Sequence, residues 1–104
     1  MKIVAVTACP TGIAHTYMSQ EAIERECKKR GHQIKVETQG SMGTENKLSQ
    51  EEIDAADVVI LAIGIGIDGE ERFDEKRDNG KVIEANPSLV IKDPGKFVDQ
   101  AEQL

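Results

Sequence analysis

The sequence predicts a single doubly wound α/β domain spanning residues 1–104, with a four-stranded, mostly parallel sheet and helices on both of its faces. Two observations carry this prediction. Lys2–Thr7 and Val58–Ile63 are nearly continuous apolar runs, as in strands that are buried on both faces. Helical stretches alternate with the strand-like segments, which is typical of a parallel sheet covered by helices. A chain of 104 residues also has the length of one domain.

The first half of the chain is expected to form two strands around one long helix. Lys2–Thr7 is the first strand, and Ile13–Arg30 is a helix that ends at Gly31, a residue type favoured just after a helix. Apolar and polar residues alternate over Gln33–Thr38, which indicates a strand at or near an edge of the sheet. Gln39–Lys47 is predicted to be a glycine-rich loop.

The second half is expected to add two strands and two helices. Ser49 and Glu52 form a capping-box pattern that opens a short helix to Ala56, and Val58–Ile63 should lie inside the sheet. The remaining segments, in chain order, are a loop over Gly64–Gly69, a helical turn around Glu71–Phe73, a strand over Lys81–Glu84, an unassigned stretch over Asn86–Lys92, and a helix over Pro94–Gln103 with Asp93 as its N-cap.

The loops that follow the first three strands should lie along one rim of the sheet, because crossovers between parallel strands are right-handed. This arrangement would bring Cys9, the Gly40 loop and the Gly64 loop together. Open α/β sheets bind ligands at the carboxyl ends of their strands. The same rim is therefore the predicted site.

Composition excludes several classes of function. The net charge is −6 and the chain has one Tyr, two Phe and no Trp, which argues against binding nucleic acid. Val58–Ile63 is the longest apolar run and the N-terminus lacks a secretory apolar segment, so we expect a cytoplasmic chain without direct membrane insertion. Two cysteines and two histidines form no zinc-like pattern, and neither a metal nor a cofactor is expected.

Cys9 stands at the carboxyl tip of the first strand, and a glycine-containing turn leads from it into the first helix. A helix N-terminus attracts anions and favours the thiolate of a nearby cysteine. The sequence therefore predicts Cys9 as a nucleophile beside a phosphate. Cys27 lies on the apolar stripe of the helix and is expected to be a buried structural residue. The predicted phosphate-binding residues are Thr11, Gly12, Ile13, Ala14, His15 and Thr16.

Two other functions are compatible with these patterns. Low-molecular-weight-type cysteine phosphatases share the strand–loop–helix arrangement, but they carry arginine six positions after the cysteine. His15 stands there instead, and histidine lacks the planar fork that grips a phosphoryl group in two places. A dinucleotide site is the second alternative. Gly64, Gly66 and Gly69 match the glycine fingerprint, and Glu84 follows Gly64 at about the spacing of a ribose-binding acid.

Cys9–Thr16, which reads Cys-Pro-Thr-Gly-Ile-Ala-His-Thr, resembles the phosphorylation loop of the fructose-type IIB component of the bacterial phosphoenolpyruvate-dependent sugar phosphotransferase system. The similarity covers Met1 to Lys76, about three quarters of the chain. Beyond the loop it runs through Tyr17-Met18, Lys35–Ser41, Ala55–Ile60 and Glu71–Phe73.

The resemblance implies a phosphoryl relay. A phosphohistidine of the IIA component would phosphorylate Cys9, and the phosphocysteine would donate to a fructose-like sugar held by the membrane IIC component. In the family these parts are often fused, but a chain of 104 residues has no room for the others, so we expect a stand-alone IIB. Gln39, Gly40 and Ser41 are then expected to form a flanking recognition loop for partner or substrate. Independently of the resemblance, Arg72 is expected to be a solvated or docking charge.

Overall fold

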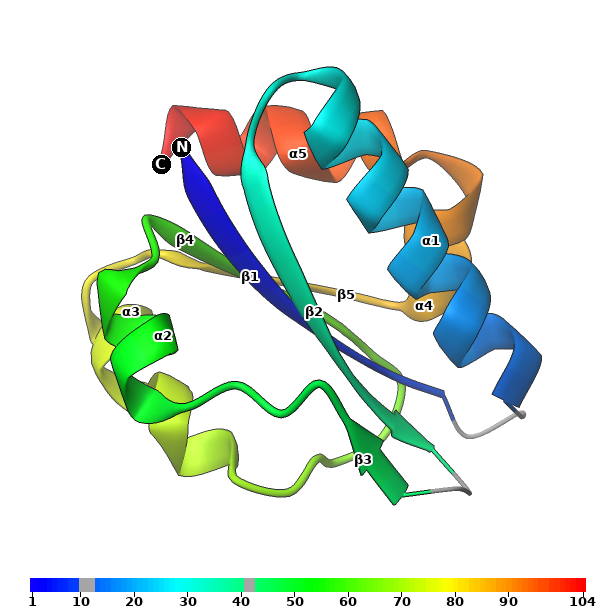
Figure 1. The fold of residues 1–104 in the computed structure, drawn as a ribbon, viewed down its shortest axis with the longest axis horizontal. Coiled ribbons are helices and arrows are strands. Elements are labelled where there is room, and N and C mark those ends of the chain that lie inside the picture. Colours follow the sequence, from blue (N-terminus) through cyan, green and yellow to red (C-terminus); the bar gives the residue numbers. More distant parts are fainter. Residues whose placement is uncertain (10–12, 41–42) are drawn as a thin grey trace.

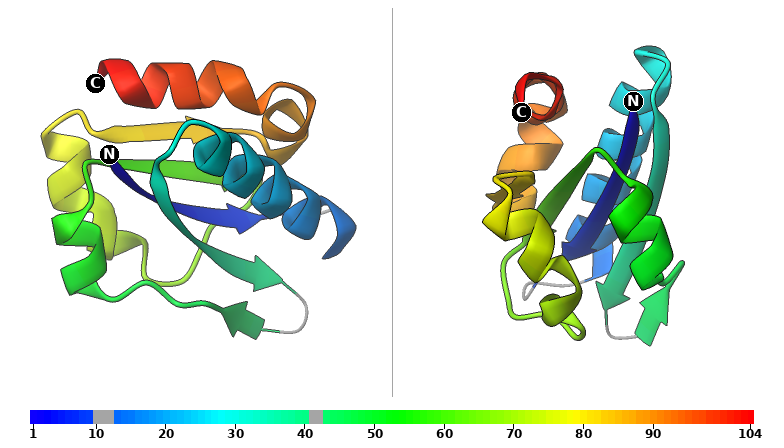
Figure 2. Two further views of the ribbon diagram at one scale, coloured as in Figure 1. Left: turned by 45° about the horizontal axis from the view of Figure 1, so that its top comes forward. Right: turned by 90° about the vertical axis from the view of Figure 1, so that its left-hand side faces the viewer.

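A computed structural model describes residues 1–9, 13–40 and 43–104 of the chain. Its centre is a twisted five-stranded sheet in the order β3-β2-β1-β4-β5 (Figures 1 and 2). Strands β2, β1, β4 and β5 run parallel, and β3 pairs antiparallel with β2. The strands are β1 (Lys2–Ala8), β2 (Gln33–Gly40), β3 (Gly43–Glu45), β4 (Val58–Ile63) and β5 (Val82–Ala85).

Helices cover both faces of the sheet, as predicted (Figure 1). One face carries α1, α4 and α5, and the other carries α2, α3 and the short 3₁₀ helix η1. Each helix is too short or too polar to cross a bilayer within the part of the chain that the structure describes. The helices are α1 (Ile13–Lys29), α2 (Gln50–Ala55), η1 (Glu70–Phe73), α3 (Asp74–Asp78), α4 (Pro87–Lys92) and α5 (Pro94–Gln103).

Strand β1 supplies both hydrophobic cores, because successive side chains of a strand point to opposite faces. Ile3 and Ala5 pack with the α1, α4 and α5 side, whereas Val4 and Val6 pack with α2 and η1. Phe73 is fully buried in the second core. Burying an aliphatic or phenyl side chain contributes roughly 1.5–3 kcal/mol, so this strand with two apolar faces fixes the middle of the sheet.

The helix boundaries follow the predicted signals. Ser49 caps α2 in a complete capping box, in which its side chain accepts from the Glu52 N–H and the Glu52 carboxylate accepts from the Ser49 N–H. Asp93 accepts from the Lys96 N–H at the start of α5. Gly31 follows α1 with a φ of 79°, a conformation that L side chains rarely adopt. The unassigned stretch after Asn86 forms α4.

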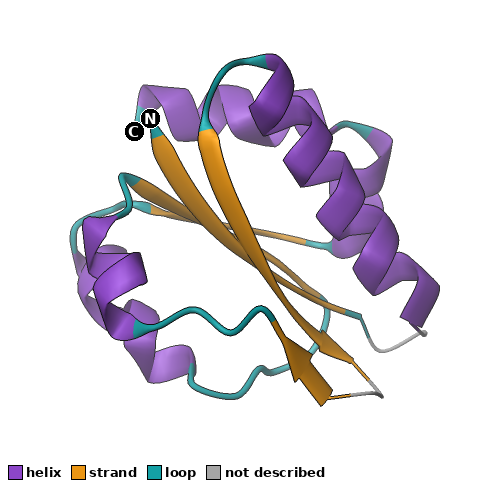
Figure 3. Cartoon of the chain, viewed as in Figure 1, coloured by secondary structure: helices purple, strands orange, loops and turns teal. Residues whose placement is uncertain are grey.

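The predicted strand count of four is wrong, because β3 forms within the predicted glycine-rich loop. Gly43–Glu45 pairs with the end of β2 in the register Thr38 to Glu45 and Gly40 to Gly43 (Figure 3). All three residues of β3 are exposed. An exposed edge strand buries no side chain and therefore has no alternating apolar pattern in the sequence.

The chain reverses its direction of winding between β1 and β4. Strand β1 leads through α1 to β2 on one side, whereas its other neighbour, β4, leads through η1 and α3 to β5 on the opposite side. The helices that follow β1 and β4 thus lie on opposite faces of the sheet, which leaves a crevice between the two strand ends at the carboxyl edge, where α/β folds bind ligands. The Gly64 N–H donates to the Ala8 carbonyl at 2.9 Å and joins the two strand ends.

Candidate functional site

Cys9 follows β1 directly and lies at this carboxyl edge, half-buried. Its Sγ lies 3.6 Å from Nδ1 of His15, an exposed residue in the first turn of α1. The fold thus brings a thiol and an imidazole into hydrogen-bond contact across six positions of sequence. An imidazole nitrogen beside sulfur can donate a hydrogen bond to it or accept one from it.

Helix α1 begins beside Cys9, so the N–H groups of its first turn, which have no partner within the helix itself, lie at the same edge. Its 17 residues give an N-terminal dipole that favours an anion there. Among the predicted phosphate-binding residues, Ile13, Ala14, His15 and Thr16 form the first turn of this helix. Thr11 and Gly12 lie outside the described residues.

The hydroxyl of Thr16 is buried and has no hydrogen-bond partner among the described residues. Thr7 and Thr38 show the same state, and they face each other across the parallel pair β1 and β2. Buried hydroxyls are normally paired. Three such groups close to the carboxyl ends of β1 and β2 and the start of α1 leave hydrogen-bonding capacity next to the candidate site.

A cavity of about 370 Å³ opens around Cys9. Gln39 and Gly40 line it, so the predicted convergence of the loops after β1, β2 and β4 is confirmed. Ser41 lies outside the described residues. The lining residues are Cys9, Gln39, Gly40, Gly43, Thr44, Ile65, Gly66 and Asp68.

The sequence placed the loops after β2 and β4 at this rim but singled out neither Thr44 nor Asp68 as a lining residue. Gly43 and Thr44 belong to the unpredicted strand β3, for which the sequence carries no apolar signal. Asp68 was hidden within a loop that we read as a possible nucleotide motif. Its backbone forms two hydrogen bonds with the Gln39 side chain. The Asp68 N–H donates to Gln39 Oε1 at 2.8 Å, and Gln39 Nε2 donates to the Asp68 carbonyl at 3.0 Å.

The prediction that Arg72 is a solvated or docking charge is wrong. Its side chain is only 11% exposed and pairs with Glu37, whose side chain is completely buried. Burial alone would raise the pKa of Glu37, but hydrogen bonds from Arg72, Gln39 and the Leu48 N–H hold that pKa below its ordinary value. The hydrogen bonds to Glu37 raise the pKa of Arg72. The sequence did hold one signal for such a pair: Glu37 is a charged residue within strand β2, and charged residues are rarely buried without a partner.

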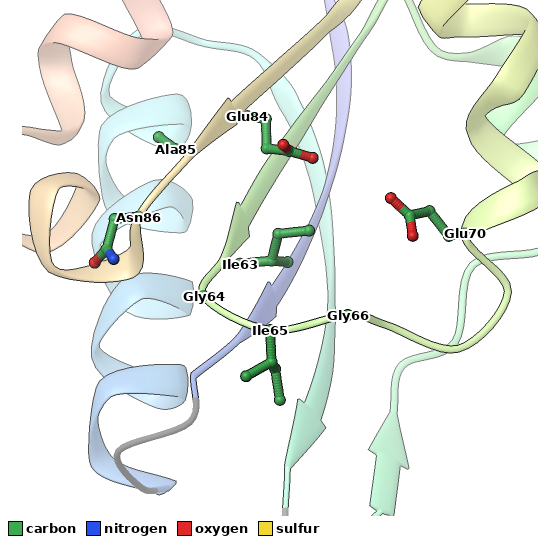
Figure 4. A pocket seen from close by; sticks show the side chains of 8 residues that line it. All are labelled: Ile63, Gly64, Ile65, Gly66, Glu70, Glu84, Ala85 and Asn86. Carbon is green, nitrogen blue, oxygen red and sulfur yellow. The ribbon is translucent and has the colours of Figure 1, made fainter.

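A second cavity of about 630 Å³ lies at the ends of β4 and β5 (Figure 4). It shares Ile65 and Gly66 with the Cys9 cavity. In Figure 4 the carboxylates of Glu70 and Glu84 face the space between η1 and β5. The Arg77 guanidinium, which the figure does not draw, lies 3.0 Å from each of them.

This geometry does not support a dinucleotide site. Such a site places the pyrophosphate at the N-terminus of a helix that follows the glycine turn. Gly69 leads instead into η1, a 3₁₀ helix of four residues. The two carboxylates of Glu70 and Glu84 also face the adjoining cavity and would repel a pyrophosphate.

Cys27, near the end of α1, is buried in the core, as predicted. Burial raises the pKa of its thiol to about 11. At neutral pH Cys27 is therefore protonated and shielded. Within residues 1–9, 13–40 and 43–104, no group of three or more His, Cys, Asp or Glu side chains could hold a metal ion.

Comparison with known proteins matches this chain to one family over nearly its whole length. Residues 4–100 match the family described as "PTS system, Lactose/Cellobiose specific IIB subunit". The chain is 62% identical over 100 residues to the fructose-like PTS system EIIBC component of Escherichia coli K12, and it spans 20% of that protein's length. It is 48% identical over 101 residues to the PTS system fructose-like EIIB component 2 of the same strain and spans 92% of that protein.

Solved structures show the same fold. A domain of the fructose-specific IIABC component of Borrelia burgdorferi superimposes with a TM-score of 0.87 at 49% identity, covering 96% of this chain and 91% of that domain. A predicted fructose-specific IIB from Escherichia coli superimposes with a TM-score of 0.89 at 36% identity, covering 98% of this chain and 87% of that protein. The similarity thus extends beyond the Met1 to Lys76 region that the motifs indicated. The chain belongs to the IIB family of the sugar phosphotransferase system, a family of phosphotransferases.

Proposed function

We propose that this chain is a phosphoryl carrier in which Cys9 receives a phosphoryl group from a phosphohistidine of a IIA component. The phosphocysteine then passes the group to a fructose-like sugar bound by a membrane IIC component. One observation carries the proposal: the Cys9 thiol lies half-buried in a cavity at the carboxyl edge, in contact with His15 and beside the start of α1.

Each transfer balances as a displacement at phosphorus. In the first, the Cys9 thiolate attacks, an S–P bond forms, and the N–P bond to the donor imidazole breaks. In the second, a sugar hydroxyl oxygen attacks, an O–P bond forms, the S–P bond breaks, and the hydroxyl proton is released. The thiolate is regenerated. The N-terminal dipole of α1 favours both the thiolate and the phosphoryl group.

The charge pattern around Cys9 suits an incoming phosphoryl group. No Asp, Glu, Lys or Arg occurs from Ile3 to Gln20, although the whole chain carries a net charge of −6. The dianionic group therefore meets no carboxylate of this segment, and among the described residues that line the cavity Asp68 alone carries one. The half-exposed sulfur is also accessible to an imidazole on the surface of another protein.

Hydrolysis is the competing outcome, as in a cysteine phosphatase. A phosphatase loop grips the phosphoryl group with the bidentate fork of arginine. His15 occupies the corresponding position, and its Nδ1 contacts sulfur. Without the fork, the site suits a group that is held until a partner accepts it.

The relatives favour a fructose-like sugar. The similar proteins of Escherichia coli are named fructose-like, and the two solved neighbours are fructose-specific. The matching family description names lactose and cellobiose instead. Vesicles that contain a fructose-type IIC, supplied with phosphorylated chain, should phosphorylate fructose in preference to cellobiose. The reverse preference would contradict the assigned sugar class.

We also propose that residues 1–104 act as one IIB unit in the cytoplasm and need no cofactor. The IIA donor would approach the rim that contains Cys9, and Gln39, Gly40 and Ser41 would flank that contact. Both transfers use the same sulfur, so IIA and IIC must occupy this rim in turn.

The relay is tested by mass spectrometry of the intact chain after incubation with phosphoenolpyruvate, the general proteins of the system and a fructose-type IIA. We expect a gain of one phosphoryl group that Cys9→Ala abolishes. The matched control is Cys27→Ala, which removes the buried thiol and should still gain the group.

Other outcomes would contradict the relay. Rapid turnover of an aryl phosphate by the chain alone, without any carrier proteins, would indicate a phosphatase. A phosphoryl group on Cys9→Ala would place the acceptor elsewhere, and His15→Gln would then identify whether the imidazole receives it.

A further inference from the structure

We propose that the buried Glu37–Arg72 ion pair is a positioning device for the reaction of Cys9. It ties the loop of residues 64–69 to the end of β2, and that loop supplies Ile65, Gly66 and Asp68 to the wall of the Cys9 cavity. The inference rests on the proposed function, since it assigns a role in phosphoryl transfer at Cys9.

Glu37 is saturated with hydrogen bonds in the interior. Arg72 donates to both carboxylate oxygens, at 2.8 Å to Oε1 and 2.9 Å to Oε2. The Leu48 N–H donates to Oε1 at 2.7 Å, and the Gln39 side-chain amide donates to Oε2 at 2.7 Å. The carboxylate thus joins the segment after β3, the end of β2 and η1 at one point.

Arg72 uses all five of its N–H donors. Besides the two bonds to Glu37, Nε donates to the Gly69 carbonyl at 2.7 Å and Nη1 to the Leu48 carbonyl at 2.7 Å. The fifth bond runs from Nη2 to the Asp68 carbonyl at 3.1 Å. Two of these acceptors belong to the 64–69 loop, so the guanidinium holds the loop by its backbone.

Gln39 transmits this restraint to the cavity. Its amide bonds both Glu37 and the backbone of Asp68, and Gln39 and Asp68 line the cavity together with Cys9. Gly69 permits the close approach: its φ is 71°, and an added Cβ would lie 2.6 Å from Arg72 Nε.

The pair is better explained by positioning than by stability. A buried ion pair is often replaceable by apolar residues without loss of stability, because the desolvation of both charges offsets their attraction. Its directional hydrogen bonds, in contrast, define one loop geometry. Catalysis depends on such geometry, since a displacement of about 1 Å can lower a rate roughly a hundredfold.

The test compares Arg72→Lys with Arg30→Lys. Lysine keeps the charge but cannot bond in the planar fork. Arg30 is a matched control: it binds Glu26, Asp99 and Glu102 at the opposite end of α1, far from Cys9. Transfer from phosphorylated IIA, measured per folded protein, should fall roughly tenfold to a hundredfold in Arg72→Lys. It should stay near the wild-type rate in Arg30→Lys.

Amide exchange provides a readout that needs no partner protein. The Asp68 N–H, protected by Gln39 in the wild type, should exchange faster in Arg72→Lys and in Gln39→Ala, and not in Arg30→Lys. Gln39→Ala leaves the ion pair intact and serves if Arg72→Lys fails to fold.

The outcomes separate the two proposals. If the wild type accepts no phosphoryl group from IIA, the proposed function fails, and a role for the pair in that transfer fails with it, whereas Asp68 exchange still reports on the tether. Normal transfer by folded Arg72→Lys, or unchanged Asp68 exchange in both variants, would overturn the positioning role alone.

Discussion

At the scale of single residues, the chemistry of the site depends on what faces the Cys9 sulfur. His15 places a ring nitrogen 3.6 Å from sulfur, and an imidazole differs in kind from a guanidinium fork. A carrier needs a phosphocysteine that survives until the acceptor arrives. A second donor aimed at the equatorial phosphoryl oxygens would stabilise the transition state for attack by water as well.

His15→Arg should therefore shorten the lifetime of the phosphocysteine in water. The phosphorylated variant is isolated from its donor, and the release of inorganic phosphate is followed over time. His15→Lys is the matched control, because it adds a point charge without the planar fork. An equal phosphate-release rate in the wild type and His15→Arg would show that the imidazole has no part in retaining the group.

At the scale of elements, capping residues predicted the helix boundaries better than apolar patterns did. The boundaries of α2 and α5 were predictable because Ser49, Glu52 and Asp93 act within a few residues of the helix they cap. Strand β3 was not predictable, because it forms by pairing with the end of β2 and all of its residues are exposed. The Glu37–Arg72 pair joins positions 35 residues apart, and no local rule connects them.

Ser49→Ala tests the strength of such an end signal. Helix α2 has six residues, so the loss of its capping box should lower the free energy of unfolding by about 1 kcal/mol. Urea unfolding measures the change as a shift in midpoint at constant slope. Ser49→Thr, which keeps a hydroxyl cap, should recover most of the loss. A midpoint unchanged in Ser49→Ala would mean that the capping box adds nothing to α2.

At the scale of the whole molecule, the parallel order, the two-sided helix cover and the meeting of three loops were predictable from the sequence. Apolar strands and right-handed crossovers suffice for that much. The buried Glu37–Arg72 pair behind the site was not predictable, because which buried polar residues pair depends on the three-dimensional fold. Arg72 lies among charged neighbours in sequence and looks like a surface residue, yet its side chain is 11% exposed.

Glu37→Gln should change how global stability depends on pH. The folded pKa of Glu37 lies below its ordinary value, so the unfolded chain binds the proton more readily and the carboxylate stabilises the fold above about pH 4.3. This contribution is lost as pH falls through the folded pKa. At pH 7 the variant should unfold more easily by about 3 kcal/mol, because Arg72 keeps an unpaired buried charge.

The difference in the free energy of unfolding between wild type and Glu37→Gln should then shrink in acid. Urea unfolding from pH 7 to pH 3 measures it. Glu21→Gln is the control, since Glu21 pairs with Arg25 at an exposed position and such pairs contribute little. A gap that stays constant across this range would show that the charge on Glu37 does not stabilise the fold.

Both ends of the chain lie at the amino edge of the sheet, away from Cys9. The Met1 amine lies 3.1 Å from Nδ1 of His32, and Nε2 of the same ring contacts Glu102 near the end of α5 at 2.6 Å. Strand β1 spans seven residues, which separates this edge from the thiol by roughly 20 Å. A tether attached to either end would leave the thiol uncovered and raise the local concentration of a fused partner domain.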